Sequence, residues 1–64
     1  MRKNVNFSTY QKVKEFFEKN KGKKFNKTKI RDETNVDYES VKLIIESLHK
    51  ERFIKKVKSE YWRE

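Results

Sequence analysis

The feature that most constrains the fold of this chain is a regular apolar stripe between residues 41 and 48. Its four members recur at i, i+3, i+4 and i+7 and are Val41, Ile44, Ile45 and Leu48. This spacing gathers side chains on one face of an α-helix. Asp37, shortly before the stripe, is a suitable N-cap residue. The sequence therefore predicts a helix that begins after Asp37, ends near Glu51 and turns one apolar face to a core.

A shorter helix is predicted immediately before this one. Asn26 is another suitable N-cap, and the helix that follows it should span residues 27–34. In the connection, Asn35 tolerates a positive φ angle and Val36 is expected to point back to the core. Two helices joined by so short a turn form a helix-turn-helix, around which we expect the rest of the chain to be arranged.

The segment before these two helices predicts another helix, from about Ser8 to Asn20. Ser8 and Gln11 have the Ser-x-x-Gln form of a capping box. Gly22, the only glycine, suits the left-handed position that often follows a helix, and residues 23–25 are expected to form one short extended segment. The inward face of this helix should consist of Tyr10, Val13, Phe16 and Phe17.

The C-terminal segment changes from helical spacing to a pattern that is typical of strands. Its β-branched and aromatic residues flank the turn-like residues 58–60 and are Phe53, Ile54, Val57, Tyr61 and Trp62. We therefore predict a small β-hairpin. Tyr61 and Trp62 are adjacent, so on a strand one of them should point inward and the other outward.

Length and residue types exclude several classes of protein. A chain of 64 residues fits one domain, which we expect to span residues 1–64. It has no cysteine and a single histidine, His49, so neither a disulfide nor a metal site built on Cys or His is expected. It also has no glycine-rich phosphate loop and no arguable pairing of a nucleophile with a base. We expect no enzyme, no cofactor and no small-molecule ligand.

The chain also lacks the apolar run of roughly 20 residues that a transmembrane helix needs. We therefore expect no membrane partner and a cytoplasmic location. The composition is rich in lysine and asparagine, which would suit a regulator encoded by a phage, a plasmid or an archaeal virus. This association rests on composition alone.

The charge of the chain favours a polyanionic partner, and nucleic acid first. The net charge is +8, from 18 Lys and Arg against 10 Asp and Glu. Residues 1–31 carry a net +9, residues 32–51 a net −4 and residues 52–64 a net +3. Residues 19–31 alone hold seven basic side chains and no acidic one. The acidic middle segment contains the helix that a helix-turn-helix would place on DNA, and this is an objection to a simple DNA-binding interpretation.

The predicted order of helix, short strand, helix, tight turn, helix and hairpin resembles the winged helix-turn-helix family over almost the whole chain. The resemblance rests on apolar positions before and within the second helix, in the turn, on the third helix and at the first wing strand. These positions are Phe25, Ile30, Val36, Val41, Ile45, Leu48, Phe53 and Ile54. The chain departs from the family at Arg52, where many members have glycine, and its wing is short.

This resemblance implies a small sequence-specific protein, a transcriptional regulator that binds double-stranded DNA with its third helix in the major groove. The outer face of that helix would read bases through Tyr38, Glu39, Ser40, Lys42, Leu43 and Glu46. The basic flanks would contact phosphates through Lys23, Lys24, Lys27, Thr28, Lys29, Lys55, Lys56, Lys58 and Arg63. A lone module of this size has limited specificity, so a homodimer on paired half-sites is expected.

Other interpretations of the same residues stay open at this point. The charged outer face of the third helix is also what an ordinary solvated face looks like. The apolar positions would equally suit a three-helix domain with a disordered tail. The winged-helix scaffold could serve as a protein-interaction adaptor that offers Leu43 to a partner, and the basic ends could bind RNA or any duplex without sequence preference.

Overall fold

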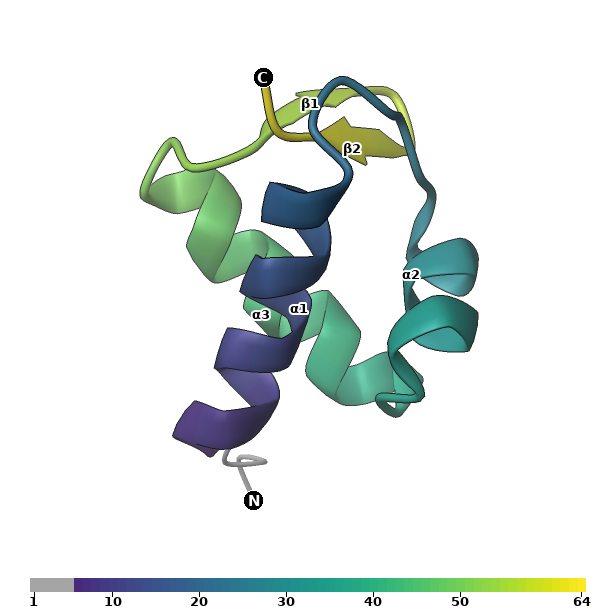
Figure 1. Cartoon of the computed structure of the whole chain (residues 1–64), viewed down its shortest axis with the longest axis vertical. Coiled ribbons are helices and arrows are strands. Elements are labelled where there is room, and N and C mark those ends of the chain that lie inside the picture. Colours follow the sequence, from purple (N-terminus) through teal and green to yellow (C-terminus); the bar gives the residue numbers. More distant parts are fainter. Residues whose placement is uncertain (1–5) are drawn as a thin grey trace.

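Three helices followed by a two-stranded antiparallel hairpin make up the described part of the chain, residues 6–64, in a computed structural model (Figure 1). The elements are α1 (Phe7–Lys19), α2 (Lys27–Thr34), α3 (Tyr38–Lys50), β1 (Lys55–Val57) and β2 (Glu60–Trp62). The prediction of a mainly helical fold with a small hairpin is confirmed. The expected domain of residues 1–64 includes residues 1–5, which lie outside the described part.

The start of α1 differs from the prediction. Asn6 caps the helix, and its side-chain oxygen accepts a hydrogen bond of 2.8 Å from the Thr9 amide. The predicted capping box of Ser8 and Gln11 is wrong, because Ser8 already lies inside the helix. Asn is at least as good an N-cap as Ser, so capping at Asn6 adds residues to α1 without losing a satisfied amide.

The core lies where α1, α2, α3 and the hairpin meet. The predicted stripe of α3 is buried throughout, as are Val36 in the turn and Tyr61 on β2. The predicted inward face of α1 is confirmed only in part, because Val13 and Phe17 are fully buried whereas Tyr10 and Phe16 pack against the core from its edge. No helix within residues 6–64 is long and apolar enough to cross a membrane.

The residues at the two ends of α2 have the side chains that helix ends require. The Asn26 side chain accepts a hydrogen bond of 2.7 Å from the Lys29 amide, which makes Asn26 the predicted N-cap. Asn35 ends the helix with φ of 57°, a left-handed conformation that asparagine tolerates better than most residues. Asp37 then caps α3 by accepting from the Ser40 amide at 3.1 Å. Both α2 and α3 therefore begin on an N-cap side chain that accepts a hydrogen bond from the amide three residues later.

The end of α3 is formed by a residue that is unfavourable for this role. Arg52 has φ of 64°. Its amide donates to the His49 carbonyl oxygen at 3.0 Å, and the Phe53 amide donates to the Leu48 carbonyl oxygen at 2.9 Å. This pair of bonds is the Schellman motif that ends many helices, usually with glycine at the left-handed position. Arg52 therefore makes this turn itself, although it is not a glycine.

The hairpin is held to the helical part through the linker between α1 and α2. Lys56 on β1 pairs with Tyr61 on β2, and the turn consists of residues 58–59. The amides of Phe25 and Tyr61 donate to each other's carbonyl oxygens at 2.9 and 2.8 Å. The linker therefore runs beside β2 at one end of the molecule (Figure 1). The predicted extended segment of residues 23–25 is confirmed only at Phe25, which forms an isolated bridge.

Candidate nucleic-acid interface

The outward face of α3 carries four of the six residues that the sequence proposed as base readers. Tyr38 is 44% exposed, and Glu39, Lys42 and Glu46 are also exposed. Glu39, Lys42 and Glu46 lie on the side of the helix opposite the buried stripe, and Tyr38 stands in the first turn beside that stripe. These four side chains are free to contact a partner along α3.

Ser40 does not share this exposed face. It is 4% exposed, and its hydroxyl donates to Asp37 Oδ1 at 2.9 Å. The hydroxyl therefore supports the N-cap of α3 from within the first turn. A contact from Ser40 to a base would require α3 to lose that bond. Ser40 is therefore not among the exposed residues of α3 that can meet a partner.

Leu43 lies at a boundary and is half-buried. On one side it lines a hollow with residues of α1 and, on the other, a hollow that Glu46, Lys50 and Lys56 also line. The second hollow connects the outward face of α3 with strand β1. The exposed part of α3 and the hairpin thus adjoin each other.

Three of the predicted phosphate ligands are already engaged with other residues. Lys29 Nζ lies 3.3 Å from Glu33 Oε2, and Lys55 Nζ lies 3.0 Å from Glu64 Oε1. Both pairs are exposed, and such pairs contribute at most about 1 kcal/mol. They can therefore open when a stronger anion approaches.

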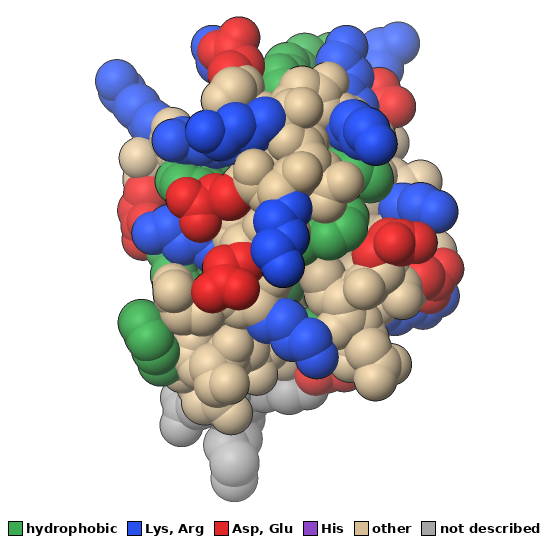
Figure 2. Space-filling view, in the orientation of Figure 1, with side chains coloured by type: hydrophobic (Ala, Val, Ile, Leu, Met, Phe, Trp, Pro, Cys, Tyr) green, Lys and Arg blue, Asp and Glu red, His purple; other side chains and the backbone are tan. Residues whose placement is uncertain are grey.

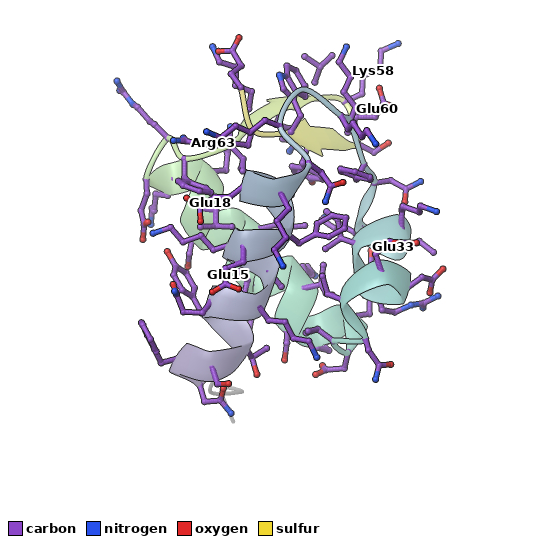
Figure 3. All side chains as sticks on the ribbon, viewed as in Figure 1. Glu15, Glu18, Glu33, Lys58, Glu60 and Arg63 are labelled. Carbon is purple, nitrogen blue, oxygen red and sulfur yellow. The ribbon has the colours of Figure 1, made fainter. Side chains whose placement is uncertain are left out.

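Arg63 is engaged more firmly. Its guanidinium lies 4.0 Å from the centre of the Phe53 ring, and its Nη1 donates to the Phe53 carbonyl oxygen at 2.8 Å. The Gly22 amide donates to the Arg63 carbonyl oxygen at 2.7 Å. In Figure 3 Arg63 lies across the end of α1, whereas Lys58 lies at the far end of the hairpin with Glu60. Arg63 thus holds the C-terminal segment against Phe53 and Gly22, whereas Lys58 is exposed to solvent.

Three of the remaining predicted lysines lie against the aromatic residues of β2. Lys24 Nζ lies 4.9 Å from the centre of the Trp62 ring, and the Nζ atoms of Lys27 and Lys56 lie 5.8 and 5.9 Å from that of Tyr61. These are cation–π distances. The bridge between Phe25 and Tyr61 causes this gathering, because it draws the linker and α2 to the hairpin. Lys23 is also exposed on this linker.

A hollow of about 260 Å³ lies where the first turn of α2, the first turn of α3 and the hairpin meet. We call it the α2 hollow, and it is lined by Asn26, Lys27, Thr28, Tyr38, Ser59 and Tyr61. The amides of Lys27 and Thr28 have no acceptor within residues 6–64, since they lie in the first turn of a helix. None of the three hydroxyls from Tyr38, Ser59 and Tyr61 makes a hydrogen bond with another described residue either.

The chemistry of the α2 hollow is that of an anion site. Amide groups at a helix N-terminus, hydroxyl donors and the Lys27 ammonium group can all donate to an acceptor, and the hollow contains no carboxylate. A phosphate group is an acceptor with negative charge, so it matches the amide, hydroxyl and ammonium donors that line the hollow.

The sequence did not identify three residues of the α2 hollow as binding residues. Asn26 was assigned only to the N-cap of α2 and Ser59 only to the turn, and Tyr61 was recognised only as one of two adjacent aromatic residues that point to opposite sides of a strand. A pattern within the C-terminal segment cannot reveal that the hairpin folds back onto the start of α2. The signal that was available is the Phe25 segment, whose extended backbone pairs with Tyr61.

Positive side chains are spread over the end of the molecule where the linker and the hairpin lie, with acidic side chains among them (Figure 2). Comparison of the chain with protein-family models, with curated proteins and with solved structures finds no match.

Proposed function

We propose that this chain is a winged helix-turn-helix protein that binds double-stranded DNA in a sequence-specific way and acts as a transcriptional regulator. Helix α3 would enter the major groove, and the start of α2, the linker and the hairpin would contact the phosphate backbone. The order of the elements supports this assignment, because the isolated bridge of Phe25 to β2 lies where the winged-helix arrangement has a short strand between α1 and α2.

The observation that carries the proposal is the α2 hollow. It combines two free helix amides, three hydroxyls and one ammonium group, all of them donors, within reach of the exposed first turn of α3. A backbone phosphate bound in this hollow would place Tyr38 and the residues that follow it beside the adjacent base edges. The lysines around Tyr61 and Trp62 would contact neighbouring phosphates.

The exposed residues of α3 have the chemistry for base recognition. Lys42 can donate to guanine O6 and N7, and Glu39 or Glu46 can accept from cytosine N4. The same carboxylates would repel phosphates and bases that offer only acceptors. In this arrangement the lysines of the flanks provide most of the affinity, and α3 mainly discriminates between sequences.

Selection of bound sequences from a random duplex pool tests the proposal, followed by binding measurements on the selected site over a range of salt concentrations. We expect one enriched motif and an affinity that falls steeply with salt. Enrichment without a motif would indicate sequence-indifferent binding to duplex or RNA. The absence of binding at low salt would contradict the proposal and favour the protein-interaction adaptor.

Two alanine variants separate the proposed roles. Lys42→Ala should relax the preference at one or two base positions by about 1–3 kcal/mol, whereas Lys24→Ala should weaken binding to all sequences alike and lower the salt slope by about one. Both side chains are exposed, so neither change should unfold the chain. If Lys42→Ala leaves the selected motif unchanged, the placement of α3 in the groove is wrong.

A further inference from the structure

The size of the α2 hollow suits a single small group better than a whole ligand molecule. Its volume of about 260 Å³ lies below the roughly 300–1,000 Å³ of pockets that take drug-sized ligands. Three elements enclose it, because α2 and α3 contribute residues at their starts and the hairpin contributes Ser59 and Tyr61. Only one group of a larger molecule therefore fits inside.

Tyr61 supplies a hydroxyl to this hollow from a side chain that belongs to the core. The residue is 4% exposed, yet its hydroxyl makes no hydrogen bond with any residue between positions 6 and 64. The hydroxyl of a side chain buried to this extent is normally hydrogen-bonded. Its free state, in a hollow that Tyr61 lines, indicates a ligand that brings an acceptor.

No carboxylate opposes an anion in the α2 hollow, although acidic residues are adjacent to it in the sequence. Glu60 precedes Tyr61 on β2, and neighbours on a strand point to opposite faces, so the Glu60 side chain lies away from the hollow. The Asp37 carboxylate, at the start of α3, accepts hydrogen bonds from the Ser40 amide and hydroxyl at 3.1 and 2.9 Å. The lining itself contains an ammonium group and no acidic side chain.

We propose that the α2 hollow is a discrete site for a terminal phosphate group, that of inorganic phosphate or of a phosphate monoester, and that this group competes with DNA for the site. A terminal phosphate has three strong acceptor oxygens and a charge of about −1.5 to −2 at pH 7. The two amides, three hydroxyls and one ammonium group of the hollow provide two donor groups for each oxygen. This inference rests on the proposed function, because it concerns the same hollow, and it adds a ligand that regulates DNA binding.

The terminal group matches the α2 hollow better than the phosphodiester of a DNA backbone does. A diester has one negative charge, and two organic chains must leave a hollow that three elements enclose, whereas a monoester has one chain and inorganic phosphate has none. We expect inorganic phosphate to bind with a dissociation constant on the order of millimolar, as suits so small a ligand. Dimethyl phosphate, which imitates the backbone group, should bind about tenfold more weakly.

Titration of the ¹⁵N-labelled chain without DNA tests the proposal, with sodium phosphate, dimethyl phosphate and sodium chloride compared at equal ionic strength. Sodium phosphate should shift the amides of Lys27 and Thr28 until they saturate. Shifts no larger than those in sodium chloride, or an equal affinity for dimethyl phosphate, would overturn the proposal. A nucleoside 5′-monophosphate distinguishes the two sources of the group. If it binds at least as tightly as inorganic phosphate, the ligand is a monoester, and if it binds more weakly, the ligand is the free anion.

A pair of matched variants assigns the binding to the α2 hollow. Tyr61→Phe removes one hydroxyl from the hollow and should weaken phosphate binding about tenfold. The control is Tyr10→Phe, which removes a hydroxyl outside the hollow that donates to Glu51 at 2.9 Å, and it should leave the phosphate affinity unchanged. Ser59→Ala, in the exposed turn, removes a second hydroxyl without altering the core. Unchanged phosphate affinity in both Tyr61→Phe and Ser59→Ala would overturn the proposal.

Competition on the selected duplex measures the regulatory effect. Sodium phosphate at about 10 mM should weaken DNA binding about threefold or more beyond sodium chloride of equal ionic strength, because it occupies the hollow. A duplex affinity that depends on ionic strength alone would overturn the competition. If the chain binds no duplex, the proposed function fails, whereas the titration without DNA still decides whether the hollow binds phosphate.

Discussion

Two arginines near the C-terminus, Arg52 and Arg63, have structural roles in the backbone in addition to their charge. Arg63 stacks on Phe53 and donates to its carbonyl oxygen, and Arg52 adopts the left-handed conformation that ends α3. Both were counted among the basic residues that could face a polyanion. Their positions show that the net charge overstates the number of side chains free to bind phosphate.

Arg52 leads to a prediction about stability. A residue with a Cβ atom at φ of 64° is strained by about 1–2 kcal/mol, and glycine is not. Glycine also increases the entropy of the unfolded chain, which offsets part of this gain. Arg52→Gly should therefore be more stable than Arg52→Ala by about 1 kcal/mol, measured by urea unfolding. Equal stability of the two variants would show that the left-handed conformation is not strained.

Tyr10 gives a prediction about pH. Burial raises the pKa of Tyr10 above its ordinary value of about 10, and so does the Glu51 carboxylate, which accepts a hydrogen bond of 2.9 Å from the Tyr10 hydroxyl. As the pH rises through 10, the unfolded chain releases this proton before the folded chain does. The folded state then holds more protons, so its stability falls as the pH increases.

The Tyr10→Phe variant isolates this effect from the titration of the lysines, which both proteins share. Unfolding in urea between pH 8 and pH 11 should show a smaller loss of stability in the variant than in the parent chain above pH 10. The variant should differ from the parent by a constant amount below pH 9, where Tyr10 is protonated in both states. Parallel curves over the whole range would contradict the role given to Glu51.

At the scale of elements, the sequence was most informative where local chemistry decides the structure. The bounds of α2, the buried stripe of α3, the caps Asn26 and Asp37 and the left-handed Asn35 all agree with the structure. Each depends on residues within one turn of each other. The start of α1 was wrong because two adjacent segments, at Asn6 and at Ser8, both offered acceptable caps.

The parts that could not be predicted depend on contacts between distant segments. The α2 hollow exists because Phe25 pairs with Tyr61, 36 positions later, and so brings Ser59 and Tyr61 to the start of α2. Similarly, the burial of Ser40 and the stacking of Arg63 follow from packing that no local pattern contains. The sequence therefore predicted a set of base-reading residues and a set of phosphate-contacting residues. Only the fold shows which residues of the two sets lie side by side.

The α2 hollow itself is tested by removing one hydroxyl. In Tyr61→Phe the buried ring and its contacts with Lys27 and Lys56 are kept, and one donor to the proposed phosphate is lost. Affinity for DNA should fall about tenfold, as expected for a hydrogen bond to a charged group. The loss should be the same for selected and random duplexes, since a phosphate carries no sequence information.

The control for Tyr61→Phe is the stability of the variant itself. Its unfolding midpoint in urea should match that of the parent chain, because the hydroxyl makes no hydrogen bond within the described residues. An unchanged affinity for DNA in a stably folded variant would remove Tyr61 from the interface. A loss restricted to the selected duplex would point to a base contact in place of a phosphate contact.

At the scale of the whole molecule, two surfaces of different chemistry lie on different elements. The α2 hollow and the lysines around β2 form a positively charged surface with many donors. The hollow between α1 and α3, by contrast, has no charged residue in its lining, which consists of Phe7, Tyr10, Leu43, Ile44 and Ser47. The acidic residues of α3, which seemed to oppose DNA binding, lie between these two surfaces. In a DNA complex they would select among bases while the flanks hold the backbone.

The most direct test of the central claim, that the α2 hollow and the exposed face of α3 bind duplex DNA, is NMR titration of the ¹⁵N-labelled chain with its selected duplex. We predict the largest amide shifts at Lys27 and Thr28, at Ser59 and Tyr61, and along the exposed positions of α3 from Tyr38 to Glu46. The amides of α1 should shift least. Shifts confined to α1, or no shifts at saturating DNA, would contradict the claim.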